Sequence, residues 1–183
     1  MNNKDFLAQL YRSFAQFVPK EVIGKNFVAS DQASMPGANE LFTELMNLPN
    51  DKVYADIDTF LVSTDESVVS DRVKNSNNIT LFVEYGEADF TPVADGGYIQ
   101  DIAIVIAKDY TSKNSDNLNS VLSDDLCHNM LIEILTQLKK ETDIQCSACG
   151  KWIFPANINP INPKEFYGKS GYAAYIKLSK TYM

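Results

Sequence analysis

Hydrophobic side chains repeat with two different periods along this chain of 183 residues, and the change of period restricts the fold more than any other feature. In segments 5–18 and 124–140 they recur every three to four residues, as in amphipathic helices. Strand-like runs follow the first helix and then the second, at 53–62, 79–85, 99–107, 144–154 and 172–180. Runs of strands with helices between them indicate the α+β class.

The expected architecture is one domain spanning 1–183, since domains usually contain roughly 100–200 residues. An antiparallel or mixed sheet of about five strands is packed by an N-terminal helix and by a helix at 123–140. A shorter helix is expected at 39–46, with Asn39 as its N-cap. The glycines of Asp95-Gly96-Gly97 suit a tight turn, so antiparallel pairing is expected between 79–85 and 99–107.

The helix at 123–140 has the clearest pattern in the chain. Ser123 is the expected N-cap, aspartates follow it, and Lys139 and Lys140 close the last turn, so both ends complement the helix dipole. The residues expected to form its buried stripe, and those that widen it, are Leu126, Met130, Ile134, Leu138, Cys127, Leu131 and Leu135.

Four polar connections are long for a domain of this size, and we expect loops near 24–37, 63–78, 108–119 and 155–171. The last one contains Pro155, Pro160 and Pro163, which predict an ordered loop rather than a helix. Loops of this length without secondary structure are usually functional or disordered.

The charge balance argues against a protein that binds nucleic acid through basic patches. Sixteen basic residues stand against 24 acidic ones, for a net charge of -8. No apolar run approaches the roughly 18–20 residues that cross a bilayer, and the first residues lack the order of a signal peptide. We therefore expect the chain to be made and kept in a cytoplasm.

The three cysteines favour free thiols, since an odd number in an unexported chain does not make a disulfide framework. Cys146 and Cys149 form a lone Cys-x-x-Cys. A zinc site would need two further ligands, and Cys127 and His128, adjacent on a helix, point apart. A redox role would place the motif at a helix N-terminus, whereas here it lies in a strand-like run. Metal and redox roles stay open as lesser alternatives.

Other candidates for chemistry have plain structural explanations. His128, the single histidine, could act as a base, but a boundary position on the helix is favoured. Asp56 and Asp58 share one strand face and could hold Mg²⁺ or Ca²⁺. A second acidic cluster contains Glu84, Glu87 and Asp89. Solvated strand faces and loops explain both clusters. No catalytic, cofactor-binding or metal-binding residue is therefore assigned.

Aromatic residues gather in segments that are expected to be exposed, where they are typical of protein interfaces, although ordinary packing explains them equally well. The set contains Tyr98, Tyr110, Phe166, Tyr167, Tyr172, Tyr175 and Tyr182. Phe166 and Tyr167 are the strongest interface candidates, because prolines restrict the segment that carries them.

The order of elements resembles that of one family, the bacteriophage tail-completion, tail-terminator and head–tail connector proteins. The resembling parts are the helices at 5–18 and 123–140, the strands at 53–62, 79–85 and 99–107, and the final strand Tyr172-Ala173-Ala174-Tyr175-Ile176-Lys177-Leu178. The resemblance covers most of the chain but lies in a pattern of elements, not in a motif.

This resemblance implies a ring-forming structural subunit of the virion neck or tail, made in the host cytoplasm, without catalytic residues or cofactors. Its expected partners are further copies of itself and other neck, portal or tail proteins, and neither a specific nucleic-acid sequence nor a membrane. An acidic channel wall would keep DNA from sticking as it passes. The alternative, from another class, is a small cytoplasmic α+β enzyme or ligand-binding protein that uses the acidic strand face. A thiol or zinc module is a weaker third possibility.

Overall fold

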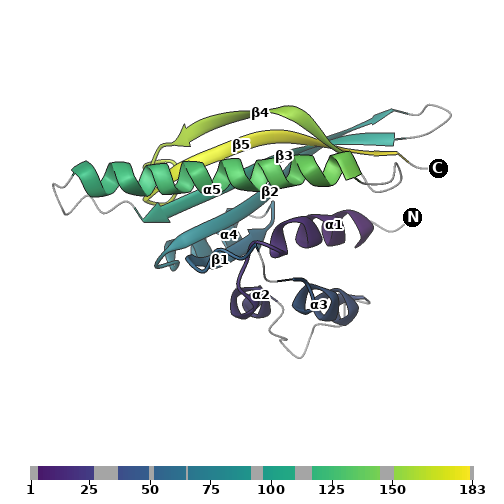
Figure 1. Ribbon diagram of the computed structural model, residues 1–183, viewed down its shortest axis with the longest axis horizontal. Helices are drawn as coiled ribbons and strands as arrows, with labels where there is room; N and C mark the ends of the chain where they lie inside the picture. The colour runs from purple at the N-terminus through teal and green to yellow at the C-terminus, as the bar shows by residue number, and fades with distance from the viewer. Residues whose placement is uncertain are drawn as a thin grey trace.

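A five-stranded mixed sheet with helices on both faces forms the protein, which confirms the α+β class (Figure 1). The computed structural model describes residues 4–26, 37–49, 52–64, 66–91, 97–109, 117–144 and 151–181. In chain order the elements are α1 (Lys4–Ala15), α2 (Lys20–Asn26), α3 (Ala38–Met46), β1 (Ile57–Val62), α4 (Glu66–Lys74), β2 (Ile79–Thr91), β3 (Gly97–Asp109), α5 (Asn117–Ile144), β4 (Lys151–Ile161) and β5 (Lys169–Thr181).

The strand order is β1-β2-β3-β5-β4. β1 runs parallel to β2, and α4 provides the crossover between them. All other neighbours are antiparallel, including the expected pair of β2 and β3, which is confirmed. β4 lies at the edge, so the sheet ends with the strand that contains two prolines.

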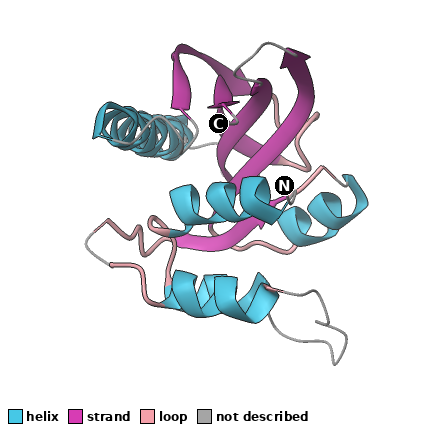
Figure 2. Cartoon of the chain, turned by 90° about the vertical axis from the view of Figure 1, so that its right-hand side faces the viewer, coloured by secondary structure: helices cyan, strands magenta, loops and turns pink. Residues whose placement is uncertain are grey.

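The main core lies between one face of the sheet and the helices α1, α2, α3 and α5. Figure 2 shows α5 nearly end-on beside the strands, with further helices below the strands. This face buries Leu81, Ile104 and Ile176 from the strands, and Phe14 of α1 meets Trp152 of β4 edge-on. We call it the core face and the opposite side of the sheet the second face.

The N-terminal region contains a helix that the sequence pattern did not predict. α1 ends at Ala15 rather than at residue 18, and α2 begins directly after Pro19. Proline is well tolerated at the start of a helix, because the amide it lacks would be unpaired there. Val22 and Ile23 are buried and hold α2 on the core. The expected loop at 24–37 therefore begins inside α2, and residues 27–36 lie outside the described part.

Three further expectations in this half are wrong. The connection at 63–78 contains α4, whose Val69 and Val73 are buried one helical turn apart. The strand expected at 53–62 begins only at Ile57. The N-cap of α3 is Gly37 rather than Asn39, and its φ of 88° is one that glycine adopts without strain.

The expected loop at 155–171 is also wrong, because most of it is strand. Pro155 and Pro160 belong to β4, where an edge position tolerates a residue without an amide hydrogen. Residues 162–168 alone turn the chain into β5. Inside the sheet Gly171 has a φ of 154°, and a Cβ there would lie 2.1 Å from the carbonyl oxygen of Ile106.

α5 is longer than the helix expected at 123–140. It begins at Asn117, so Ser123 and the two aspartates after it lie inside the helix rather than at its start. Leu126, which was expected to be buried, is 40% exposed. The stripe that faces the core consists of Cys127, Met130, Leu131, Ile134, Leu135 and Leu138.

Candidate functional site

The second face of the sheet is covered over only part of its length. Phe82 of β2 and Ala173 of β5 lie beneath Val69 and Val73 of α4, and the turn that carries Phe166 packs against the same cluster. Two residues further along each strand this cover ends. There the register places Glu84 beside Ala103, Ala103 beside Tyr175, and Tyr175 beside Asn157.

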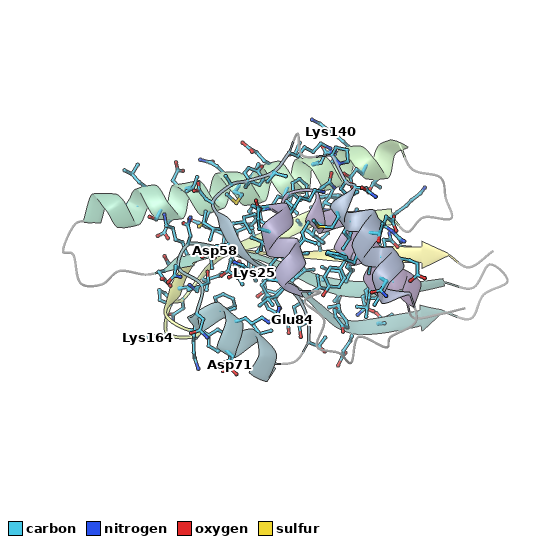
Figure 3. All side chains as sticks on the ribbon, turned by 90° about the horizontal axis from the view of Figure 1, so that it is seen from below. Lys25, Asp58, Asp71, Glu84, Lys140 and Lys164 are labelled. Atoms are coloured by element: carbon cyan, nitrogen blue, oxygen red, sulfur yellow. The ribbon has the colours of Figure 1, made fainter. Side chains whose placement is uncertain are left out.

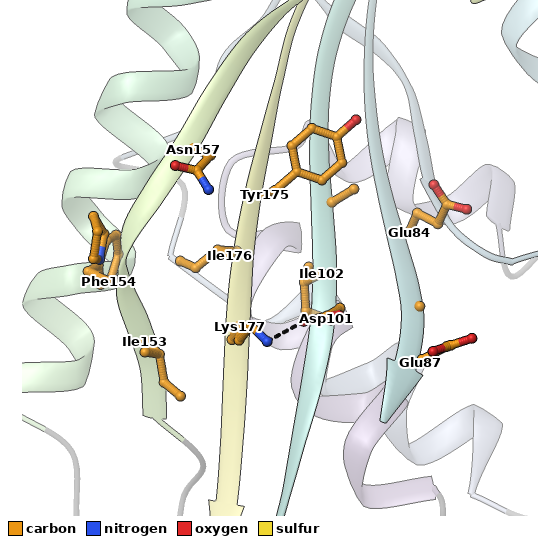
Figure 4. Close-up of a pocket in the computed structure, with 13 residues that line it drawn as sticks. Glu84, Glu87, Asp101, Ile102, Ile153, Phe154, Asn157, Tyr175, Ile176 and Lys177 are labelled. Atoms are coloured by element: carbon orange, nitrogen blue, oxygen red, sulfur yellow. Dashed lines mark ion pairs between the residues drawn. The ribbon is translucent and has the colours of Figure 1, made fainter. Parts of the chain in front are cut away.

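This uncovered part forms an open trough with a volume of about 590 Å³. Tyr175 and Lys177 of β5 and Asp101 and Ala103 of β3 make its floor (Figure 4). The two flanking strands, β2 and β4, form its walls. The wall residues are Glu84, Gly86, Glu87, Ile153, Phe154, Pro155 and Asn157.

A β-bulge lies in each wall of the trough. The register of β2 shifts between Tyr85 and Ala88, and that of β4 shifts between Ile153 and Asn157, whereas the pairing of β3 with β5 is continuous. The side-chain amide of Gln100 donates to the carbonyl oxygens of Gly86 and Glu87 and so fills the first bulge from the core face. Bulges bend the strand that carries them, so these two shape the hollow between the walls.

The trough has an acidic side and an apolar side. Glu84 and Glu87 lie on the β2 wall, whereas Ile153 of β4 is 37% exposed and Tyr175 is 52% exposed. Asp101 lies 3.2 Å from the ammonium group of Lys177, and both of these side chains are more than half exposed. The lining therefore contains three carboxylates and one ammonium group, which favours a ligand with positive charge and an apolar surface.

The polar side chains that line the trough are three carboxylates, one lysine, one tyrosine and one asparagine among the described residues. Its carboxylates are exposed at a surface rather than gathered in a closed pocket. A second hollow of about 430 Å³ is open, and its lining includes the charged residues Lys25, Asp58 and Asp71 as well as the apolar Val22 and Phe60 (Figure 3).

The interface candidates from the sequence do not form one surface. Phe166 and Tyr167 are half-buried in the β4–β5 turn, where Phe166 stacks on Phe82 at 6.3 Å between ring centroids. Tyr172 lies on the core face, 4.8 Å from the ring of His128. Tyr98 belongs to β3 at the opposite end of the sheet, and Tyr110 lies outside the described residues.

The structure describes some of the candidates for metal chemistry and not others. Cys127 is buried in the core, whereas Cys146 and Cys149 lie outside the described residues. Asp58 accepts hydrogen bonds from the hydroxyl of Ser76 and from two backbone amides that follow it, so both of its oxygens organise the turn before β2. Within the described ranges, no three His, Cys, Asp or Glu residues cluster as metal ligands.

An apolar patch at the start of α5, which we call the α5 end, was missed because the helix was expected to begin only at residue 123, with Leu126 in its buried stripe. Val121 and Leu122 are 54% and 56% exposed, and Leu126 is 40% exposed. The first turns of α5 project beyond the end of the sheet, so no strand lies beneath them (Figure 1). The sequence signal was present: these three residues continue the helical period in front of residue 127.

Comparison of the chain with protein-family models, with curated proteins and with solved structures finds no match. Among the helices in the described ranges, none has a stretch that is long and apolar enough to cross a membrane. The functional inference therefore rests on the trough, the α5 end and the charge of the chain.

Proposed function

We propose that the chain is a structural subunit, not an enzyme, and that its copies form a ring at the head–tail junction or tail of a bacteriophage particle. Its partners are then further copies and the neighbouring neck, portal or tail proteins. It is made in the host cytoplasm and acts in the virion.

The α5 end carries this proposal. Val121, Leu122 and Leu126 expose apolar surface near the start of α5, and the first turns of this helix project beyond the sheet (Figure 1). Covering such surface stabilises an assembly by about 25 cal/mol per Å². The patch lies at one end of an asymmetric molecule, so it suits a head-to-tail contact with a different surface of the next copy. Contacts of this kind close into rings when the rotation between copies permits it.

The β4–β5 turn lies at the same end of the molecule as the start of α5 (Figure 1). Its Phe166 and Tyr167 are only half-buried by their own chain, so part of each ring is left for a neighbour to cover. We propose that the aromatic rings of both residues are buried further when copies assemble. The inner wall of the assembled oligomer would be acidic, because each copy carries a net charge of -8, and DNA would pass without adhering to it.

A double substitution at the α5 end tests the proposal. Val121→Ser with Leu122→Ser should abolish assembly in sedimentation velocity, while the circular dichroism spectrum stays that of the wild type. Thr136→Ser with Lys140→Ser, two exposed positions on the same helix, is the matched control and should assemble normally. Assembly of the Val121/Leu122 variant at the wild-type level would refute the contact.

The second candidate function is that of a small α+β enzyme or ligand-binding protein. The volume of the trough, about 590 Å³, favours it, because small-molecule sites occupy roughly 300–1,000 Å³. Its acidic groups would be Glu84, Glu87 and Asp101, since Asp58 is engaged in its own turn. A small soluble oligomer that a low-molecular-weight cation stabilises against heat would support this function over the ring.

A further inference from the structure

We propose that the trough is a docking site for one amphipathic helix of a different protein, with a basic flank beside an apolar stripe. The proposal goes beyond ring formation and does not depend on it, because the trough and the α5 end share no residue. The occupant is identified by the shape, the apolar surface and the charge of the trough.

The shape of the trough matches a helix. Four strands spaced about 4.8 Å apart give a face roughly 14 Å wide, and an α-helix with its side chains is about 10–12 Å across. The same face already binds a helix over its other part, where α4 inserts Val69 and Val73. An occupant beyond α4 would continue that layer and complete the cover of the sheet.

The apolar contact would centre on Tyr175. Its side chain is 52% exposed on the floor, Ile153 is 37% exposed on the β4 wall, and the small side chain of Ala103 leaves depth between Tyr175 and Glu84. Tyrosine is among the residues that most often dominate the free energy of an interface, especially near its centre. One face of a helix, with apolar residues spaced three and four apart, fills such a groove.

The carboxylates of the trough determine which charge the flank of the incoming helix should carry. Asp101 is already paired with Lys177, whereas Glu84 and Glu87 form no ion pair with any other residue in the described part of the chain. Docking removes water from their side of the trough, and a buried carboxylate without a partner opposes binding. Lysine or arginine along that flank of the incoming helix would compensate both carboxylates and speed the encounter.

A second copy of this chain is a poor occupant. The exposed end of α5 is the obvious convex element, but it carries Asp124 and Asp125 and would bring further negative charge to Glu84 and Glu87. Two troughs facing each other would leave a void, because both are concave.

The test is a selection from a display library of helical peptides on the full-length protein. We expect enriched peptides to carry apolar residues at helical spacing and a net positive charge. In fluorescence anisotropy titrations, Tyr175→Ser with Ile153→Ser should lower the affinity for an enriched peptide by about tenfold or more, the loss expected at an anchor position. Glu84→Gln with Glu87→Gln should lower this affinity less and should make it depend less on the salt concentration.

Val121→Ser with Leu122→Ser is the control and should bind the peptide like the wild type, whether or not it assembles. The proposal is overturned if selection enriches no peptide, if the enriched peptides are neutral or acidic, or if the Tyr175/Ile153 variant binds equally well. Circular dichroism of each variant confirms that lost binding is not lost folding. Failure of peptide binding with intact ring assembly would remove this proposal and leave the ring in place.

Discussion

Asp109 and Lys169 are register partners in the β3–β5 pair, and the buried Lys169 ammonium nitrogen lies 2.5 Å from an Asp109 carboxylate oxygen. The same ammonium group donates to the Ser76 carbonyl oxygen at 3.0 Å. The Lys169 side chain is completely buried, whereas that of Asp109 is 48% exposed. One charged group thus joins the end of β3, the start of β5 and the turn after α4.

Removing the two partners of this pair should have unequal effects. Asp109→Ala leaves the buried ammonium group with a single partner, the Ser76 carbonyl oxygen. We therefore expect the free energy of unfolding to fall by about 2–3 kcal/mol. The loss should be smaller than for most broken buried pairs, because Asp109 is half-exposed. Lys169→Met removes the buried charge itself and should cost less, about 1 kcal/mol for the unpaired Ser76 carbonyl. Urea titrations measure both. A larger loss for Lys169→Met would contradict this account.

The packing of α5 on the sheet gives the second prediction. Ile134 is completely buried in the main core, so Ile134→Ala should lower the free energy of unfolding by roughly 2–5 kcal/mol. Ile132 on the same helix is 39% exposed, and Ile132→Ala should change it by about 0.5 kcal/mol or less. Thermal and urea unfolding compare the two. Equal effects would mean that the helix is rotated relative to the sheet.

Two glycines should respond to alanine with opposite signs. At Gly171 a Cβ would collide with backbone atoms of β3, so we expect Gly171→Ala to cost about 2–4 kcal/mol or to prevent folding. Gly24 lies in α2 with nothing within 4 Å of its Cβ position, and Gly24→Ala should stabilise by about 0.5–1 kcal/mol. A neutral Gly171→Ala would show that β5 is not in this register.

The buried thiol of Cys127 should be unreactive. Burial, followed by the negative charge of Asp124, raises the pKa of Cys127 from about 9 to about 11, so at pH 8 almost no thiolate forms. In a Cys146→Ser, Cys149→Ser background, iodoacetamide should modify the native protein only when it unfolds. Because the unfolded thiol ionises at lower pH than the folded one, the free energy of unfolding should fall as the pH rises from about 9 to 11. Rapid labelling of the native protein at pH 8 would contradict this prediction.

The α+β class and the hairpin of β2 with β3 were predictable because periodicity reports which residues face a core. α4 was not, because its buried face consists of only two valines, Val69 and Val73, in an otherwise polar segment. The prolines of β4 indicated a loop, since the sequence does not say which strand will lie at an edge. Both errors arise from tertiary context that local pattern does not carry.

The trough was less predictable than the fold. Its acidic wall was visible as the cluster of Glu84, Glu87 and Asp89, but most of the strand that faces it, β4, lay in the loop expected at 155–171. The bulges that shape it depend on register and on the side chain of Gln100, which neither alternation nor composition reports. Of the α5 end, Leu126 was assigned to the buried stripe, because a helical stripe does not tell where the sheet beneath it stops, and Val121 and Leu122 lay in front of the expected helix.

The most direct test of the central claim is electron microscopy of the purified full-length protein, raised in concentration to its solubility limit. The account predicts closed rings with a hollow centre and one fixed number of 20.5 kDa copies. A Phe166→Ser, Tyr167→Ser variant should stay folded and form no rings, because the half-exposed aromatic turn lies at the same end of the molecule as the start of α5. A wild-type protein that remains monomeric at every concentration, or a double variant that forms the same rings, would contradict the account.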